Sequence, residues 1–382
     1  MTSHFFASVC QPDEQAQHDA YARQMQLTKP EGSLGILEEI VVRLAGMQAT
    51  ANPKIEKPWI SVFAADHGIA GEGVSAYPQV VTQEMVKNFC NGGAAINVLA
   101  NFAKADFEVI DVGVINDLAP LPHLVSARIA AGTENFLHQT AMSQEQMLQA
   151  LQIGADAVDR AKNSNADLFI CGEMGIGNTT AATAIAAVLS GKPVSELVGE
   201  GTGISFRQKK QKAEFIEQAI IKHQAQLTSP LRVLQILGGF EIAAMTGAYL
   251  RGAQIGMPMV VDGLIASVAA WVADFIARND QLANCDSIEK MMELGKYSIP
   301  ETLFCTCGSL PRITEWCFFA HQSAEPAHEM ILEALGGTPL LQFEMRLGEA
   351  SGAALVIPLL QQACALHNQM ATFDSAGVSN AD

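Results

Sequence analysis

Positive charge is scarce in this sequence. Its 23 Lys and Arg residues stand against 40 Asp and Glu residues, which gives a net charge of −17 over 382 residues. Neutralising the phosphates of a nucleic acid requires a basic face, so this balance argues against a nucleic-acid partner. Hydrophobic residues make up 49% of the chain and charged residues 16%, a composition typical of a globular protein with a large core.

Long hydrophobic runs and a cysteine framework are also missing. Apolar stretches such as 265–272 are far shorter than the roughly 20 residues that cross a bilayer, and residues 1–11 lack the pattern of a signal peptide. We therefore expect no membrane partner and a cytoplasmic location. The eight cysteines follow no repeating spacing, which favours reduced thiols. Only Cys305 and Cys307 are close together, and without a second pair their spacing predicts no metal site.

From Trp59 onward, the sequence alternates short apolar runs with helical patterns. Four of these runs end in polar or glycine-rich turns: 60–65, 107–110, 168–171 and 259–261. This alternation predicts an α/β fold with a mostly parallel sheet that carries helices on both faces. Ligands in such folds bind beyond the carboxyl ends of the strands, so we expect the polar residues of these turns along one rim.

Helical patterns fill the segments between and around these runs. Residues Ser143 to Gln146 have the pattern of a capping box and predict the start of a helix. The segment 351–365 is apolar almost all round and predicts a buried helix. Further helices are predicted over 12–27, 36–47, 179–189 and 207–224, and residues 372–382 have the composition of a tail.

A glycine-rich turn at 171–180 lies where an apolar run passes into a predicted helix. Glycine lets a ligand approach the backbone closely, and free N–H groups at a helix start attract anions, so the turn predicts a phosphate site. It matches neither a Walker A loop nor the dinucleotide fingerprint. A tight turn in which Asn178 or Thr179 caps the helix explains the same residues equally well.

A second glycine cluster, 199–203, is followed by the basic residues Arg207, Lys209, Lys210 and Lys212. A local cationic patch beside a flexible loop suits a phosphate or a carboxylate. The alternative is a solvated helix face, which explains most of these lysines.

Glu349 lies among small residues at the entrance to the predicted buried helix. Burial there would raise its pKa and make it a usable general base near neutral pH. Alternatively, Glu349 occupies the first turn of the helix, where a negative charge suits the helix dipole. The same ambiguity applies to Asp66, His67 and Asp262, since strand-end groups of this kind are more often hydrogen-bonded structural residues than catalysts.

Together these segments resemble the nicotinate-nucleotide:dimethylbenzimidazole phosphoribosyltransferase family. Several long motifs agree at once and in the family's order, which makes the match specific. They span about residues 28 to 360 and comprise 29–35, 65–68, 72–74, 172–180, 238–240, 261–263, 323–325 and 346–349.

The resemblance implies transfer of phosphoribose from nicotinate mononucleotide to 5,6-dimethylbenzimidazole, giving α-ribazole 5′-phosphate and nicotinate in cobalamin (vitamin B12) biosynthesis. It implies inversion at C1′, no cofactor, a general base that matches Glu349, and a second acidic residue that matches Glu173. The substrate contacts that it implies fall on Gly175, Gly177, Asn178, Thr179, Thr180, Gly201, Gly203, Lys212, Asp262 and Ser323, with Tyr77, Met85 and Leu347 lining the benzimidazole pocket.

The family fold combines a large α/β domain with a small helical domain made from both chain ends, and its members form homodimers. The resemblance implies a large domain at 55–345, a small domain at 1–54 with 346–382, and an insertion at 276–312. Two residues depart from the family pattern: Ala350 stands where glycine is frequent, and Ala320 precedes His321 where a Ser-His pair is common.

Two other functions stay open on the sequence alone. A phosphoribosyltransferase that uses a diphosphate donor would need paired acids in a magnesium-binding loop, and the segment 260–263 has one acid. A non-catalytic nucleotide or base sensor would keep the pocket without needing Glu349.

Overall fold

A single sheet of parallel strands forms the centre of the protein, as a computed structural model of residues 7–201, 203–278 and 312–379 shows. The strand order is β3-β2-β1-β4-β5-β6-β7. The strands are β1 (Pro58–Ala65), β2 (Asp106–Gly113), β3 (Leu124–Ser126), β4 (Leu168–Met174), β5 (Met259–Val261), β6 (Cys317–His321) and β7 (Pro339–Leu341). The predicted parallel sheet is confirmed. The predicted apolar runs did not include β3, β6 and β7, which are three to five residues long.

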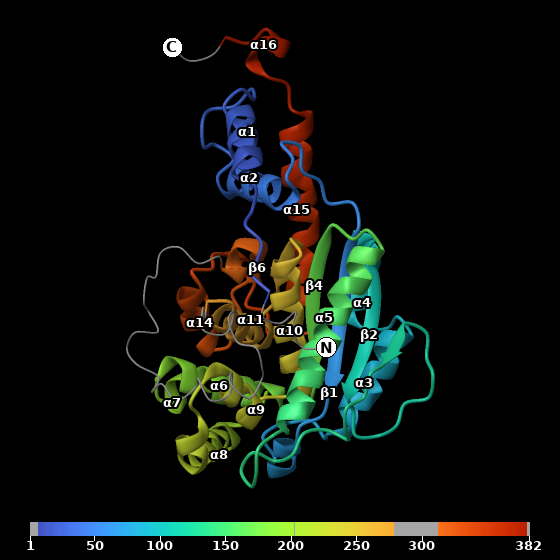
Figure 1. Cartoon of the computed structure of the whole chain (residues 1–382), viewed down its shortest axis with the longest axis vertical. Helices are drawn as coiled ribbons and strands as arrows, with labels where there is room; N and C mark the ends of the chain where they lie inside the picture. The colour runs from blue at the N-terminus through green and yellow to red at the C-terminus, as the bar shows by residue number, and fades with distance from the viewer. Residues whose placement is uncertain (1–6, 202, 279–311, 380–382) are drawn as a thin grey trace.

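Helices cover both faces of this sheet, as predicted (Figure 1). One face carries α5 (Gln144–Asn163), α10 (Phe240–Gln254) and α11 (Leu264–Ala277), and the other carries α3 (Val80–Cys90), α4 (Ala95–Ala103) and α15 (Ser351–Gln369). The remaining helices around the sheet are α6 (Asn178–Ser190), α7 (Val194–Leu197), α8 (Phe206–His223), α9 (Pro230–Leu237) and α14 (Ala327–Leu335). Ser143 accepts from the N–H of Gln146, so the capping box predicted for the start of α5 is also confirmed.

The helices α5 and α10 cross at two glycines. A Cβ atom on Gly154 would overlap the carbonyl oxygen of Ala244, and one on Gly247 would overlap the carbonyl oxygen of Leu151. The two backbones therefore touch directly, which is possible only because neither position carries a side chain. This crossing holds α10 against the middle of the sheet.

A small helical unit is built from both chain ends, as predicted. It consists of α1 (Glu14–Gln24), α2 (Ile36–Gln48) and the far end of α15, and Figure 1 shows it standing beyond one end of the sheet. Arg23 Nε donates to the carbonyl oxygen of His367 at 2.9 Å, which joins α1 to α15. The boundaries of the two domains stay a prediction. The expected tail contains the short helix α16 (Phe373–Ala376), and the expected insertion with Cys305 and Cys307 falls almost entirely outside the described residues.

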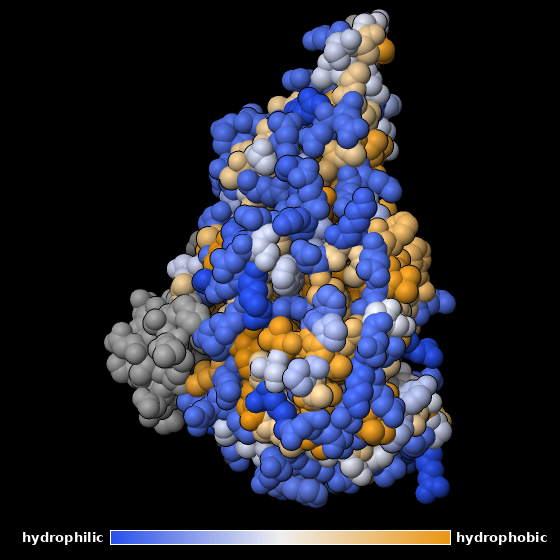
Figure 2. Space-filling view, turned by 90° about the vertical axis from the view of Figure 1, so that its right-hand side faces the viewer, coloured by the Kyte–Doolittle hydropathy of each residue, from blue (hydrophilic) through white to orange (hydrophobic). Residues whose placement is uncertain are grey.

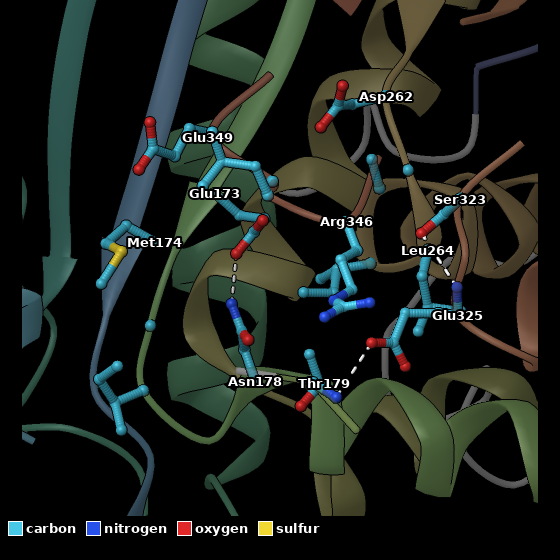
Figure 3. Close-up of a pocket in the computed structure, with 18 of the residues that line it drawn as sticks. Glu173, Met174, Asn178, Thr179, Asp262, Leu264, Ser323, Glu325, Arg346 and Glu349 are labelled. Carbon is cyan, nitrogen blue, oxygen red and sulfur yellow. Dashed lines mark hydrogen bonds between the residues drawn. The ribbon is translucent and has the colours of Figure 1, made fainter. Parts of the chain in front are cut away.

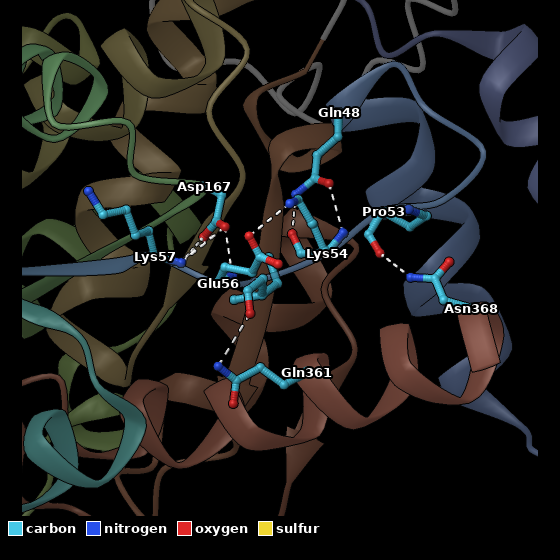
Figure 4. Close-up of polar contacts among 9 residues, drawn as sticks. Gln48, Pro53, Lys54, Glu56, Lys57, Asp167, Gln361 and Asn368 are labelled. Atoms are coloured by element: carbon cyan, nitrogen blue, oxygen red, sulfur yellow. Dashed lines mark hydrogen bonds and ion pairs between the residues drawn. The ribbon is translucent and has the colours of Figure 1, made fainter.

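The linker between α2 and β1 is held by side chains of the large domain and of α15 (Figure 4). The carboxylate of Asp167 accepts the N–H of Glu56 at 2.6 Å and the N–H of Lys57 at 3.0 Å. Asn368 on α15 donates to the carbonyl oxygen of Pro53 at 2.9 Å. These contacts fix the direction in which the chain enters the sheet.

We expect Asp167→Ala to lower the free energy of unfolding by about 1–2 kcal/mol, because two main-chain N–H groups lose their acceptor. Urea denaturation followed by circular dichroism measures the change. Glu56→Ala is the control: its 2.8 Å ion pair with Lys54 is exposed, and such pairs contribute about 0–1 kcal/mol. Equal stability of the Asp167 variant and the wild type would show that this carboxylate does not hold the linker.

The molecular surface mixes hydrophilic and hydrophobic side chains. Figure 2 shows hydrophobic side chains gathered in the lower half of one face. On α4, Val98 is 64% exposed and Phe102 is 77% exposed. No helix among the described residues is both long enough and apolar enough to cross a membrane.

Candidate active site

A cavity of about 320 Å³ opens beyond the carboxyl ends of the central strands. Gly175 follows β4, Asp262 follows β5 and Ser323 follows β6, and all three line its wall. The strand order reverses between β1 and β4, and ligands of open α/β sheets bind at such a switch point. The cavity therefore lies on the rim that the strand and turn pattern predicted.

Three residues with buried carboxyl groups line this cavity: Glu173, Asp262 and Glu349 (Figure 3). Their residues are 7%, 4% and 7% exposed, respectively. Burial, followed by the negative charges of Glu241, Asp262 and Glu349, raises the pKa of Glu173 to about 8. Burial raises the pKa of Asp262 to about 7, and burial together with the charge of Asp262 raises the pKa of Glu349 to about 7. The cluster can therefore exchange protons near neutral pH.

Glu349 precedes α15 rather than lying within it. The helix begins at Ser351 with Ala350 as its N-cap, so the alternative in which Glu349 occupies the first helical turn is wrong. Figure 3 shows the Glu349 carboxylate turned away from that of Glu173. The N–H of Ile96 stabilises the Glu349 carboxylate, while Glu349 Oε2 is buried with no hydrogen-bond partner among the described residues. A buried carboxylate oxygen without a donor is suited to accept a proton from a ligand.

The glycine turn at 175–177 forms another part of the wall. Helix α6 is capped by Gly177, whose φ is +100°, and no side chain caps it. The expectation that Asn178 or Thr179 caps this helix is therefore wrong. The physical reason is that both side chains have other partners: Asn178 Nδ2 donates to Glu173 Oε2, and Thr179 Oγ1 accepts from Lys212 Nζ at 2.8 Å.

Lys212 lies directly behind Thr179, on the inner side of α8. It is 1% exposed, and burial lowers the pKa of its ammonium group to about 8. Arg207 and Lys210 on the same helix are exposed, as the solvated-face alternative predicted. The second glycine cluster reaches the cavity at Gly201, whose N–H donates to Glu325 Oε1 at 3.0 Å. The Thr179 hydroxyl and the buried Lys212 behind it are thus found at this end, together with the carboxylate of Glu325. A hydroxyl and a cation are groups that can bind an anion.

Most of the residues predicted for the site line the cavity. These are Glu349, Glu173, Gly175, Asn178, Thr179, Gly201, Asp262, Ser323, Tyr77 and Leu347. The others lie outside the lining and comprise Gly177, Thr180, Gly203, Lys212 and Met85. Met85, which the resemblance places in the benzimidazole pocket, lies on α3 and packs against the hydrophobic core instead.

Asp66 and His67 also stay outside the lining and make structural contacts. Asp66 Oδ2 accepts the N–H of Ile115 at 2.9 Å. His67 Nε2 lies 2.6 Å from Glu241 Oε1, and both side chains are fully buried. These contacts support the structural alternative for the two strand-end residues.

Three further lining residues received no chemical role from sequence reasoning: His321, Glu325 and Arg346. Figure 3 shows the guanidinium group of Arg346 turned toward the side of the cavity that holds Thr179 and Glu325. His321 ends β6, a strand that the predicted apolar runs did not include, and the sequence named it only beside a departure from the family pattern. Glu325 and Arg346 occur in segments that carry the family resemblance, which was the available signal. Among the described residues, no cluster of His, Cys, Asp or Glu has the arrangement of a metal site.

The comparisons with known proteins place this α/β chain in the phosphoribosyltransferase class. The family model described as phosphoribosyltransferase matches residues 9–283 and 302–378. The chain is 47% identical over 381 residues to the nicotinate-nucleotide–dimethylbenzimidazole phosphoribosyltransferase of Pseudomonas putida KT2440, with 100% of this chain and 99% of the relative covered. It is 46% identical over 376 residues to the enzyme of the same name from Xanthomonas euvesicatoria pv. vesicatoria 85-10, with 98% of each chain covered.

A solved structure is also similar to this chain in fold and in sequence. The crystal structure of CobT from Thermus thermophilus has a TM-score of 0.84 and 38% sequence identity, and covers 96% of this chain and 100% of that one. This chain therefore belongs to the nicotinate-nucleotide–dimethylbenzimidazole phosphoribosyltransferase family.

Proposed function

We propose that this protein transfers the phosphoribosyl group of nicotinate mononucleotide to 5,6-dimethylbenzimidazole, forming α-ribazole 5′-phosphate and nicotinate in cobalamin biosynthesis. The observation that carries the proposal is the position of Glu349. Glu349 lines the same cavity as the glycine turn at Gly175, and its buried Oε2 has no hydrogen-bond partner among the described residues. A base for the acceptor and an anion site for the donor thus share one enclosed space.

Glu349 is the proposed general base. A benzimidazole attacks C1′ of the ribose through one ring nitrogen and carries a proton on the other. Transfer of that proton to Glu349 as the new N–C1′ bond forms leaves a neutral product ring. The pKa of about 7 suits this role, since a large fraction of the carboxyl group is ionised at neutral pH and the proton transfer is nearly balanced.

We place the donor phosphate at the end of the cavity away from Glu349. The turn at Gly175, the hydroxyl of Thr179 and the loop at Gly201 line that end, and Lys212 supports Thr179 from behind. We assign Ser323 to the donor phosphate as well, and Glu173 to the support of the base or the ribose. The bond from C1′ to nicotinate breaks as the acceptor attacks from the other face, and its electron pair returns to the pyridine nitrogen. The configuration at C1′ is inverted in this scheme.

The acceptor wall is apolar at Tyr77 and Leu347, which are 55% and 57% exposed. A flat aromatic ring would cover both side chains, and a second subunit could cover what remains. We propose a homodimer on the family resemblance, and sedimentation equilibrium tests it. The cytoplasmic location stays a prediction from the sequence.

Incubation of the purified protein with nicotinate mononucleotide and 5,6-dimethylbenzimidazole tests the reaction directly. We expect nicotinate and α-ribazole 5′-phosphate to appear in equal amounts without added metal. Saturable binding without product, by a folded protein, would contradict the proposal and support the sensor. Turnover that depends on magnesium and a diphosphate donor would instead support the other phosphoribosyltransferase mechanism.

Lys212→Met should raise the KM for nicotinate mononucleotide about 10- to 100-fold, because the Thr179 hydroxyl at the donor end loses the hydrogen bond that holds it. A hydrogen bond to a charged group contributes about 1.5–3 kcal/mol. The KM for the benzimidazole should change little, since Lys212 lies at the donor end. Initial rates at varied concentrations of each substrate separate the two constants. Lys210→Met is the matched control on the exposed side of the same helix. Equal donor KM values in both variants would remove Lys212 from the donor site.

A further inference from the structure

The residues around Glu349 adopt an unusual backbone conformation. Gly348, Glu349 and Ala350 are consecutive and have φ angles of +83°, +64° and +68°. Left-handed geometry costs a residue with a side chain about 1–2 kcal/mol. Such strain persists only where the surrounding structure determines it.

Main-chain hydrogen bonds to two buried carboxylates hold this left-handed turn. The N–H of Glu349 stabilises the carboxylate of Glu173. The N–H of Ala353 donates to Asp262 Oδ1 at 2.8 Å, and the N–H groups of Ala350 and Gly352 stabilise the same Asp262 carboxylate. Asp262 therefore takes most of the N–H groups that the start of α15 presents.

Atoms of neighbouring strands also pack closely around the turn at 348–352. A Cβ atom on Gly172 of β4 would lie 2.8 Å from the carbonyl carbon of Glu349 and 2.9 Å from the Cβ of Ala350. A Cβ on Gly348 would overlap Glu173 Oε1, and a Cβ on Gly352 would overlap the ring of His321. The turn is thus enclosed by the ends of β4, β5 and β6.

We infer that Asp262 is a positioning residue for Glu349: it holds the left-handed turn by its backbone and thereby fixes the place of Glu349 in the wall of the cavity. Its carboxylate is 4% exposed and already accepts three main-chain N–H groups, which leaves little capacity for a sugar hydroxyl. This inference rests on the proposed function, because a directed general base has a purpose only if the reaction needs one.

Asp262 also acts on Glu349 through its charge. Four titratable groups face Asp262: Glu173, Glu349, the His321 ring with Nε2 at 4.0 Å, and the buried hydroxyl of Tyr249. Burial lowers the pKa of His321, so this ring stays neutral at pH 7 and does not offset the carboxylate. Glu349 itself faces the charge of Asp262 and the N–H of Ile96. A negative Asp262 therefore favours the protonated form of Glu349, and its removal favours the ionised form.

The test is Asp262→Asn, measured as the pH dependence of kcat and kcat/KM. We expect kcat to fall about 10- to 100-fold, because a misplacement of about 1 Å can cost that much. We also expect the acid limb of the profile to move about one unit to lower pH, because a like charge has been removed. The KM for nicotinate mononucleotide should stay within about twofold. KM rises when a variant loses a contact that binds the substrate and the transition state equally, and a misplaced general base is not such a contact.

Asp111→Asn is the matched control. Asp111 is also a buried aspartate of the sheet, within β2, it accepts the N–H of Val114 at 2.8 Å, and it lies outside the cavity lining. This variant should lose a similar amount of stability without moving the pH profile. If Asp262→Asn does not fold, Asp262→Glu replaces it: the charge is kept, so kcat should fall while the acid limb stays.

Two outcomes would overturn the inference. A raised donor KM at unchanged kcat would make Asp262 a substrate contact, and unchanged kcat with an unmoved acid limb would remove it from the mechanism. A wild type without turnover would instead reject the proposed function. The backbone role is then tested by amide hydrogen exchange at 350–353, which Asp262→Asn should accelerate and Asp111→Asn should not.

Discussion

Glu349→Gln is expected to lower kcat about 10²- to 10⁴-fold, the range that general base catalysis contributes. The amide has nearly the shape of the carboxylate but cannot accept the proton of the benzimidazole. Because Glu349 lies away from the phosphate end of the cavity, the KM for nicotinate mononucleotide should change little. Steady-state release of nicotinate gives both constants.

The pH dependence of the rate should also differ between the wild type and this variant. Glu349 must be ionised to act as a base, and its pKa is raised to about 7. The wild-type rate should therefore fall as the pH drops below about 7, by up to tenfold per unit, and the residual rate of the variant should lack this limb. Glu344→Gln is the control, since Glu344 is exposed and precedes the same turn. A Glu349→Gln variant that turns over at the wild-type rate would leave the proposed mechanism without its base.

Gly154→Ala is expected to lower the free energy of unfolding by about 3 kcal/mol, near the upper end of the usual cost of overpacking. The added methyl group would overlap the carbonyl oxygen of Ala244, and a backbone atom cannot rotate away as a side chain can. The helices α5 and α10 would have to separate. The gain in helix propensity, about 1 kcal/mol, offsets only part of this.

Gly71→Ala is the matched control for that measurement. A Cβ atom on Gly71 has no neighbour within 4 Å, and Gly71 does not have a left-handed φ. Its unfolding midpoint in guanidinium chloride should stay close to that of the wild type. Equal midpoints for the two variants would mean that α5 and α10 can separate at little cost, contrary to the close crossing described above.

Ala350 shows how sequence and structure combine. The sequence marked it as a departure from a family that often has glycine there. The structure supplies the reason for glycine, because the residue has a φ of +68°. Its methyl group packs against Gly172 of β4, so the departure occurs in the turn that carries the proposed general base.

The sequence by itself determined the α/β class and the rim of the sheet at which the cavity lies. These features are encoded locally: apolar runs of sufficient length indicate strands, and glycine-rich turns follow them directly. The family motifs then indicated Glu349, Glu173 and the donor loops, which the structure brings to one cavity.

Only the tertiary structure decided what those side chains contact. Asn178 looked like a helix cap and instead donates to Glu173. Lys212 belongs to a run of basic residues that suggested a solvated face, and it is buried behind Thr179. Asp262 accepts the N–H of Ala353, which lies 91 positions further along the chain. Hydrogen bonds and desolvation depend on groups that folding brings together from distant segments. No local sequence pattern can specify these contacts, because the same residue types at the same spacing are compatible with a solvent-exposed side chain and with a buried, hydrogen-bonded one.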